Sequence, residues 1–276
     1  MKDKTRILFI LFVFFCFAIS SIAQEGVHIY DTTTTNKKPT LVHIIPQHAP
    51  KPVTHEFSLG FRLNTDGWSI YTDFGKSKAV DEKHIDRFYN LKFWQIEFSE
   101  KKDPHELKST STNVSPSGGS STYIFGKVNN FYTLKPALGF RKMIAGKPDD
   151  NGVVSIHWVN TGGIAIGILK PYYINVAGDP AAIKYNANTK NDFLNSASIA
   201  GSAGFNTGIN ELTVVPGLHY KSVLHFDFSG SLNYIIAIET GVNIEYYLQD
   251  VQIMATQSSS PAFVDIFLAF QFGKRW

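Results

Sequence analysis

The sequence has a single cysteine, little charge and only one long hydrophobic run. The cysteine, Cys16, lies among the first 20 of 276 residues, so a disulfide-stapled scaffold is excluded for the rest of the chain. Charged residues make up 18% and the formal net charge is +3, which gives no sign of a nucleic-acid-binding surface. The hydrophobic run, Ile7–Ile19, has 13 residues, whereas a spanning helix needs roughly 20.

This run has the features of a secretory signal. Basic residues precede it, and Ser21 and Ala23 follow it at the positions of a cleavage site. We therefore expect residues 1–23 to be a cleaved signal peptide. Residues 24–53 contain four consecutive threonines and three prolines, which predicts an extended periplasmic arm. The folded domain is then expected at 54–276.

Aromatic residues are abundant, at 14%, and they recur with period two. The last segment, "DIFLAFQFGKRW", alternates between an apolar file and a mixed file. Eight segments show such a pattern, and a bulge is expected at Phe93–Trp94 in the third. They are 54–64, 68–75, 87–99, 130–145, a segment beginning at 153, 216–228, 232–247 and 265–276.

The connections between these segments favour a membrane barrel over a soluble sandwich. After the first turn they alternate in length, with long ones at 100–129 and 177–215, and the second of these is expected to hold a short helix. Outer-membrane barrels have short periplasmic turns and long external loops, and a sheet in lipid must close on itself. We expect an all-β, transmembrane, antiparallel up-and-down barrel of eight strands in the outer membrane of a Gram-negative bacterium, with both termini periplasmic.

The end of the chain carries a second membrane feature. Phe270, Phe272 and the terminal Trp276 lie in the apolar file of the last segment. This pattern resembles the terminal signal by which the barrel-assembly machinery recognises and inserts outer-membrane barrels. Lipid and lipopolysaccharide are the expected surroundings of this face.

The mixed file predicts a lumen filled by ion pairs, because an eight-stranded barrel is just wide enough for side chains and buried charges must pair. The "SGS" turn at 229–231 predicts a register in which Lys221 lies opposite Glu239 and pairs with it, and Asp227 lies opposite Asn233. The residues expected in the network are Arg62, Glu97, Lys135, Arg141, His157, Lys221, Glu239 and Arg275.

Three residues are the only candidates for catalysis, at the outer rim: His219, Glu245 and Asp265. A histidine beside a carboxylate can act as a general base, but no nucleophile or signature accompanies it, and lumen packing is the favoured explanation. The nine histidines show no metal-ligand spacing, and the glycine-rich stretch "NTGGIAIG" lacks the context of a phosphate loop. No catalytic residue, metal or cofactor is therefore assigned.

Three stretches resemble a known group of proteins. "FSEKKDPHELK", "YIFGKVNNFYTLKPALGFRKMI" and "NGVVSIHWVNTGGIAIGILKPYYI" are similar, in this order, to small outer-membrane β-barrel proteins of Bacteroidota. The resemblance begins at about Glu56 and runs to the end of the chain. It implies an outer-membrane barrel and no reaction. Because some small barrels of these bacteria are accessory parts of assembly and export complexes, it also implies a protein partner.

The sequence thus favours a non-enzymatic barrel that acts through its loops, its arm or a lateral partner. The alternatives are a lipid- or peptide-modifying enzyme at the outer rim, a small-solute channel, and a soluble β-sandwich.

Overall fold

A computed structural model describes residues 54–77, 90–113, 121–146, 154–229 and 233–276. They belong to one compact unit, Pro50–Trp276. The predicted signal peptide and arm, residues 1–53, lie outside the described residues.

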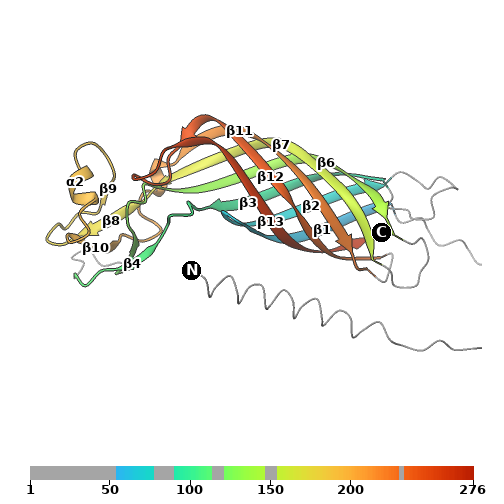
Figure 1. Cartoon of the computed structure of the whole chain (residues 1–276), viewed down its shortest axis with the longest axis horizontal. Helices are drawn as coiled ribbons and strands as arrows, with labels where there is room; N and C mark the ends of the chain where they lie inside the picture. Colours follow the sequence, from blue (N-terminus) through green and yellow to red (C-terminus); the bar gives the residue numbers. More distant parts are fainter. Residues whose placement is uncertain (1–53, 78–89, 114–120, 147–153, 230–232) are drawn as a thin grey trace, which may run out of the picture. The chain divides into compact units, whose positions relative to one another are not determined.

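Eight long strands form a closed barrel, as the sequence predicts (Figure 1). Each strand pairs antiparallel with the next one along the chain, and β1 closes the ring by pairing with β13. This is the up-and-down order of a transmembrane barrel. The strands are β1 (His55–Asn64), β2 (Gly67–Ser77), β3 (Asn90–Lys101), β6 (Asn129–Ala145), β7 (Ser155–Pro171), β11 (Thr213–Asp227), β12 (Tyr234–Val251) and β13 (Ser260–Arg275).

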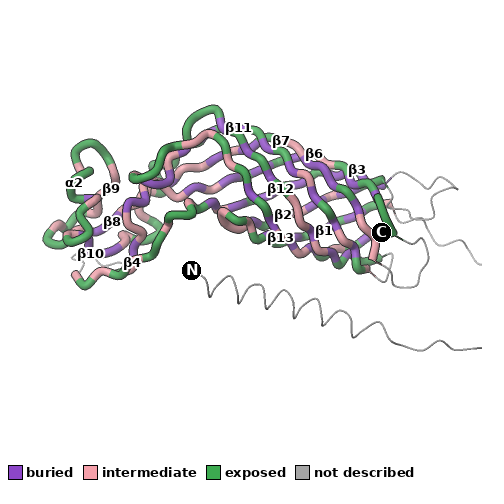
Figure 2. The backbone as a smooth tube through the Cα atoms, viewed as in Figure 1, coloured by how far each residue is buried: buried purple, intermediate pink, exposed green. Residues whose placement is uncertain are grey.

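Burial alternates along each of these strands (Figure 2). The buried positions are mostly polar and the exposed positions mostly apolar. In β1 the outward Phe57, Leu59, Phe61 and Leu63 are between 38% and 54% exposed. An apolar surface that continues from strand to strand around a barrel needs hydrocarbon to cover it. The 10 residues of β1 and 11 of β2 also match the length that a tilted strand needs to cross a bilayer. The fold is therefore a transmembrane β-barrel.

The two ends of the barrel differ. At one end, which we call the terminus end, the backbone N–H groups of Thr54 and His55 each donate to the carbonyl oxygen of Trp276 at 2.9 Å. The other end, which we call the loop end, carries the long connections. These are 102–128, 172–212 and 252–259, together with the tight turn at Thr65–Asp66.

Two of the loop-end connections fold into short elements with a small core of their own. The elements are β4 (Lys108–Thr110), β5 (Thr122–Ile124), β8 (Tyr173–Val176), β9 (Ile183–Lys184), α2 (Lys190–Phe193), β10 (Ile199–Ser202) and the 3-10 helix η1 (Ile209–Glu211). Tyr123, Ile174, Phe193 and Ile199 are buried against one another, and we call this part of the chain the outer lobe (Figure 1). The helix α2 lies within the connection that was expected to hold one. No helix among the described residues is long and apolar enough to cross a membrane.

Two local predictions were wrong. Strand β3 pairs with β2 and β6 without a register shift, so Phe93 points inward, Trp94 outward, and there is no bulge between them. Strands β11 and β12 pair with Lys221 opposite Asn243 and Asp227 opposite Ala237. The connection between them runs from Phe228 to Asn233 and is longer than the predicted three residues. Each residue of β11 therefore lies opposite a residue of β12 that is four positions further along the sequence than its predicted partner.

Candidate functional site

The lumen is the most highly charged part of the described structure. The inward positions of the barrel carry six buried Lys and Arg side chains and seven buried Asp and Glu side chains, each no more than 6% exposed. Such charges must be paired, because an unpaired ion out of water costs several kcal/mol. The cations are Arg62, Lys101, Lys135, Arg141, Lys221 and Arg275, and the anions are Glu56, Asp73, Glu97, Asp227, Glu239, Glu245 and Asp265.

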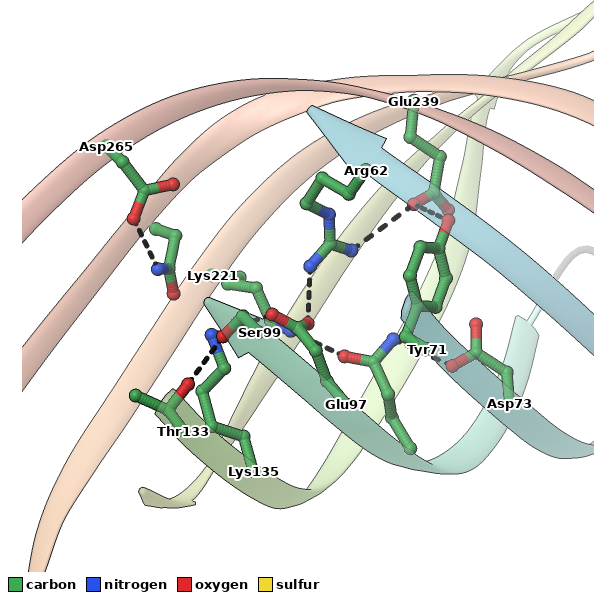
Figure 3. Close-up of polar contacts among 12 residues, drawn as sticks. Arg62, Tyr71, Asp73, Glu97, Ser99, Thr133, Lys135, Lys221, Glu239 and Asp265 are labelled. Atoms are coloured by element: carbon green, nitrogen blue, oxygen red, sulfur yellow. Dashed lines mark hydrogen bonds and ion pairs between the residues drawn. The ribbon is translucent and has the colours of Figure 1, made fainter. Parts of the chain in front are cut away.

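Glu97 of β3 is the centre of this network (Figure 3). One carboxylate oxygen accepts hydrogen bonds from both Arg62 of β1 and Lys221 of β11. The other oxygen lies 2.7 Å from the ammonium nitrogen of Lys135. Lys221 also donates to Oε1 of Gln95 at 2.5 Å. One carboxylate thus joins four strands across the lumen.

Arg62 also connects to a second carboxylate, that of Glu239. The guanidinium lies 3.7 Å from Glu239 and stacks over the ring of Tyr71 at 4.3 Å. The Tyr71 hydroxyl donates to Glu239 at 2.7 Å. Gly60 makes this possible, since a Cβ there would overlap the Tyr71 ring.

No cation among the described residues forms an ion pair with Asp73. Its two oxygens accept hydrogen bonds from the side-chain amides of Gln95 and Gln271, each at 2.7 Å. One amide donor from the neighbouring β3 and one from β13 fix this carboxylate, but they do not neutralise a charge on it.

Nearer the loop end, two lysines bind four carboxylates. Lys101 donates to Asp66 at 2.6 Å and to Asp265 at 2.9 Å. Lys135 donates to Glu245 at 2.7 Å, so it bridges Glu245 and the central Glu97. This cluster ties the ends of β3 and β6 to β12, β13 and the first turn.

A further cluster lies at the terminus end. Glu56 accepts from Arg141 at 2.7 Å and from Arg275 at 3.0 Å. Arg275 also donates to Asp227 at 2.6 Å. The first and last strands of the barrel are therefore joined by an ion pair as well as by their backbone ladder.

The three lumen histidines have different surroundings. Nδ1 of His225 lies 2.8 Å from Glu239, which is its cross-strand partner. The ring centroids of His157 and His225 lie 5.6 Å apart. The ring nitrogens of His157 and of His219 have no hydrogen-bond partner among the described residues.

An apolar cluster closes the lumen at the loop end, and we call it the cap. It consists of Phe131, Ala165, Val215, Tyr247, Val251, Ile253 and Met254. The carbonyl oxygen of Ile253 accepts from Val128 at 2.8 Å, and Ala255 donates to Gly126 at 2.7 Å, so the last connection is fastened to the one before β6. The charged network therefore lies beneath a packed apolar layer.

The structure places every predicted network residue in the lumen, but not with every expected partner. The predicted pair of Lys221 with Glu239 was wrong: Lys221 pairs with Glu97, and Glu239 with His225 and Arg62. The physical reason is the longer turn, which moves the two residues out of register. His157 lies in the lumen outside the ion pairs.

The catalytic candidates are not at an open rim. His219 lies directly opposite Glu245, but no hydrogen bond joins them, and both are at most 4% exposed. Glu245 already accepts from Lys135, Asn243 and Tyr247. Asp265 is bound by Lys101 and Asn243. The described residues also contain no group of three or more His, Cys, Asp and Glu side chains arranged to hold a metal.

Sequence reasoning gave no inward position to Lys101 and Asp66, and the expected network also lacked Glu56, Asp73 and Asp227. Lys101 continues the alternation of Gln95, Glu97 and Ser99, but strand β3 was expected to end at residue 99. Asp66 lies in a two-residue turn whose sequence gives no sign that it bends back over the lumen.

No family model matches the chain, and no curated protein matches it in sequence. In structure it is similar to Neisserial surface protein A, whose crystal structure aligns over 81% of this chain and 96% of that chain. The sequence identity is 6% and the TM-score is 0.35. The class of this protein therefore follows from its own geometry: a closed eight-stranded barrel, apolar outside and charged and filled inside, has the architecture of an outer-membrane β-barrel.

Proposed function

We propose that this chain is a non-enzymatic accessory subunit, or interaction platform, of a larger outer-membrane machine for assembly or export. The observation that supports this most directly is the filled lumen. Six cations and seven anions are packed inside beneath an apolar cap, so the chain's own side chains occupy the described interior. What the barrel offers to other molecules is its surface.

Three surfaces are available for such a role. The outer lobe extends beyond the barrel and exposes Phe205, at 65%, beside Lys170. The exposed, outward apolar residues of the eight strands, such as Leu59 and Phe61 of β1, form a second surface, which we call the apolar belt. This belt can receive a membrane partner from the side. The arm at 24–53 can add a strand to a partner or fold against it. In this proposal the termini are periplasmic, the lobe is external, the barrel belongs to the Bacteroidota group, and insertion requires the barrel-assembly machinery, which reads Phe270, Phe272 and Trp276.

Site-specific photocrosslinking in living cells tests the proposal. A crosslinking amino acid is placed at Phe205 for the lobe, at Leu218 for the belt, which is 65% exposed, and at Lys92 for the terminus end. We expect one protein to be captured repeatedly from one of these faces and not from the other two. As a control, the same residue is placed at the buried Val223, which no partner can reach.

The outcome against the proposal is equally clear. A barrel that gives no crosslink from any face, and that migrates alone after extraction in mild detergent with and without its arm, would not be an accessory subunit. Large steady conductance steps in a planar bilayer would favour the channel alternative and contradict the filled lumen.

A further inference from the structure

Among the residues that the structure describes, the outer face of the barrel becomes basic near the terminus end on one side only. Lys274 of β13, Lys76 of β2, Lys92 of β3 and Lys142 of β6 all have exposed, outward-facing side chains. We call these four residues the basic arc. Their strands are consecutive around the barrel except for β1, which lies between β13 and β2 and contributes His55 opposite Lys76.

Folding alone does not account for this arrangement. Lys76 and Lys92 are direct cross-strand partners, and like charges in such positions destabilise a sheet. Lys142 lies opposite Asn90 on one side and Trp158 on the other, and Lys274 lies opposite Phe57 and Tyr234.

No carboxylate forms an ion pair with any of the four among the described residues. All the carboxylates described at this end, such as Glu56 and Asp227, face the lumen and are bound there by arginines. Among the described residues, the positive charge of the arc therefore has no counterion on the outer face of the barrel.

The arc lies at the edge of the apolar belt. Phe74 is two residues from Lys76 on β2, and Trp94 is two residues from Lys92 on β3, which is about 7 Å along each strand. The two rings stack on each other with their centroids 4.3 Å apart. Lysine stems can lie along such an apolar surface while the ammonium groups reach the polar layer beyond it. That layer holds the phosphate groups of lipids.

The other side of the same end has a different composition. There the outward positions of β7 and β12 and the end of β11 carry Trp158, Phe228 and Tyr234, which are exposed and uncharged. Aromatic residues of this kind are common at both membrane interfaces, but a run of lysines on one side is not required for insertion.

We propose that the basic arc binds the phosphate groups of phospholipid headgroups in the leaflet nearest the chain termini. Each ammonium group offers three N–H donors, and charge-assisted hydrogen bonds to phosphate oxygens offset the repulsion between Lys76 and Lys92. The proposal requires the barrel to span a bilayer, but it does not depend on the accessory role proposed above.

Native mass spectrometry of the full chain in detergent micelles tests this. The probes are phosphatidylglycerol, phosphatidylcholine and diacylglycerol with identical acyl chains, the last of which has no phosphate. The arc variant is K76Q/K92Q/K142Q. The matched control is K102Q/K108Q/K190Q, which removes the same charge from exposed lysines at the loop end. Heat-modifiable migration on a gel shows that each variant is folded.

We expect the native chain and the control to retain phosphatidylglycerol best and diacylglycerol least, and the arc variant to lose about tenfold of its preference for phosphatidylglycerol. The single variant Lys92→Gln should lose about two- to threefold. The proposal is wrong if the arc variant keeps the native preference, if both triple variants lose it equally, or if diacylglycerol is retained as well as phosphatidylglycerol. It is also wrong if excess inorganic phosphate removes the lipid, since the site would then bind free phosphate.

Discussion

Removing the carboxylate of Glu97 should destabilise the barrel more than any other single change in the lumen. Three cations depend on this residue, and the change Glu97→Ala affects them unequally. Lys135 keeps Glu245 at 2.7 Å, and Arg62 keeps Glu239 at 3.7 Å. Lys221 keeps only the carbonyl oxygen of Gln95. Breaking a buried pair in this way costs about 3–5 kcal/mol, since it leaves a charge without a counterion.

A double-mutant cycle with Lys221→Met separates this effect from a simple loss of packing. Methionine removes the stranded charge while keeping most of the volume, so the single variant should cost only about 1–2 kcal/mol, for the lost donor to Gln95. The double variant should lose less free energy of unfolding than the sum of the losses in the two single variants. The difference, which is the coupling energy of the two residues, should be about 1–3 kcal/mol.

The measurement is urea unfolding of each variant in phospholipid vesicles, followed by tryptophan fluorescence and by heat-modifiable migration. The control is the same lysine change on the outer face, Lys92→Met, which removes a charge outside the network. The reasoning is refuted if Glu97→Ala lies within about 1 kcal/mol of the native chain or if the two lumen changes are additive, because residues in one network should couple.

Three further outcomes follow from other parts of the structure. Gly60→Ala should displace the ring of Tyr71 and lower the free energy of unfolding by about 1–3 kcal/mol, measured in the same assay, whereas Ala at an outward position should not. Phe193→Ala should make the outer lobe sensitive to protease, through a loss of about 3–5 kcal/mol of core packing, while the barrel keeps its heat-modifiable migration. Hydrogen bonds to Glu211, of which the one from Lys184 has the largest effect, lower the pKa of its carboxyl group below the ordinary 4.5. The stability that this contact gives the outer lobe should therefore be lost as the pH falls below 4.5. The measurement is the rate at which a protease that is active in acid cleaves the lobe, and this rate should rise.

The alternation of residue types predicts most of the barrel because it is a local property. A strand with Phe57, Leu59 and Phe61 on one side and Glu56 and Ser58 on the other has two unlike faces wherever it lies in the sequence. The pairing of β11 with β12 is different. It depends on how many residues leave the strands at the turn, and "SGS" is compatible with more than one answer.

The partners in the lumen are harder to predict for a related reason. Lys221 reaches Glu97 across the barrel, from β11 to β3, and the two residues are 124 positions apart in the sequence. No local pattern contains this information. The outer lobe shows the same limit: Tyr123 and Ile174 form a core only because two different connections, 102–128 and 172–212, meet there.

The charged lumen has a physical role that an apolar filling would not have. A slip of one residue in strand pairing turns the inner face of a strand outward. If the inner face were also apolar, it would contact lipid as favourably as the outer face does, and the slip would cost little free energy. With Arg62, Glu97 and Lys221 inside, such a slip would turn buried ions toward hydrocarbon, at about 2–4 kcal/mol for each Arg or Lys near the middle of the bilayer. A slip of two residues keeps the faces but separates the pairs that join β1, β3 and β11. The network therefore stabilises one register against its neighbours, and this is a sufficient reason for the barrel to keep its charges.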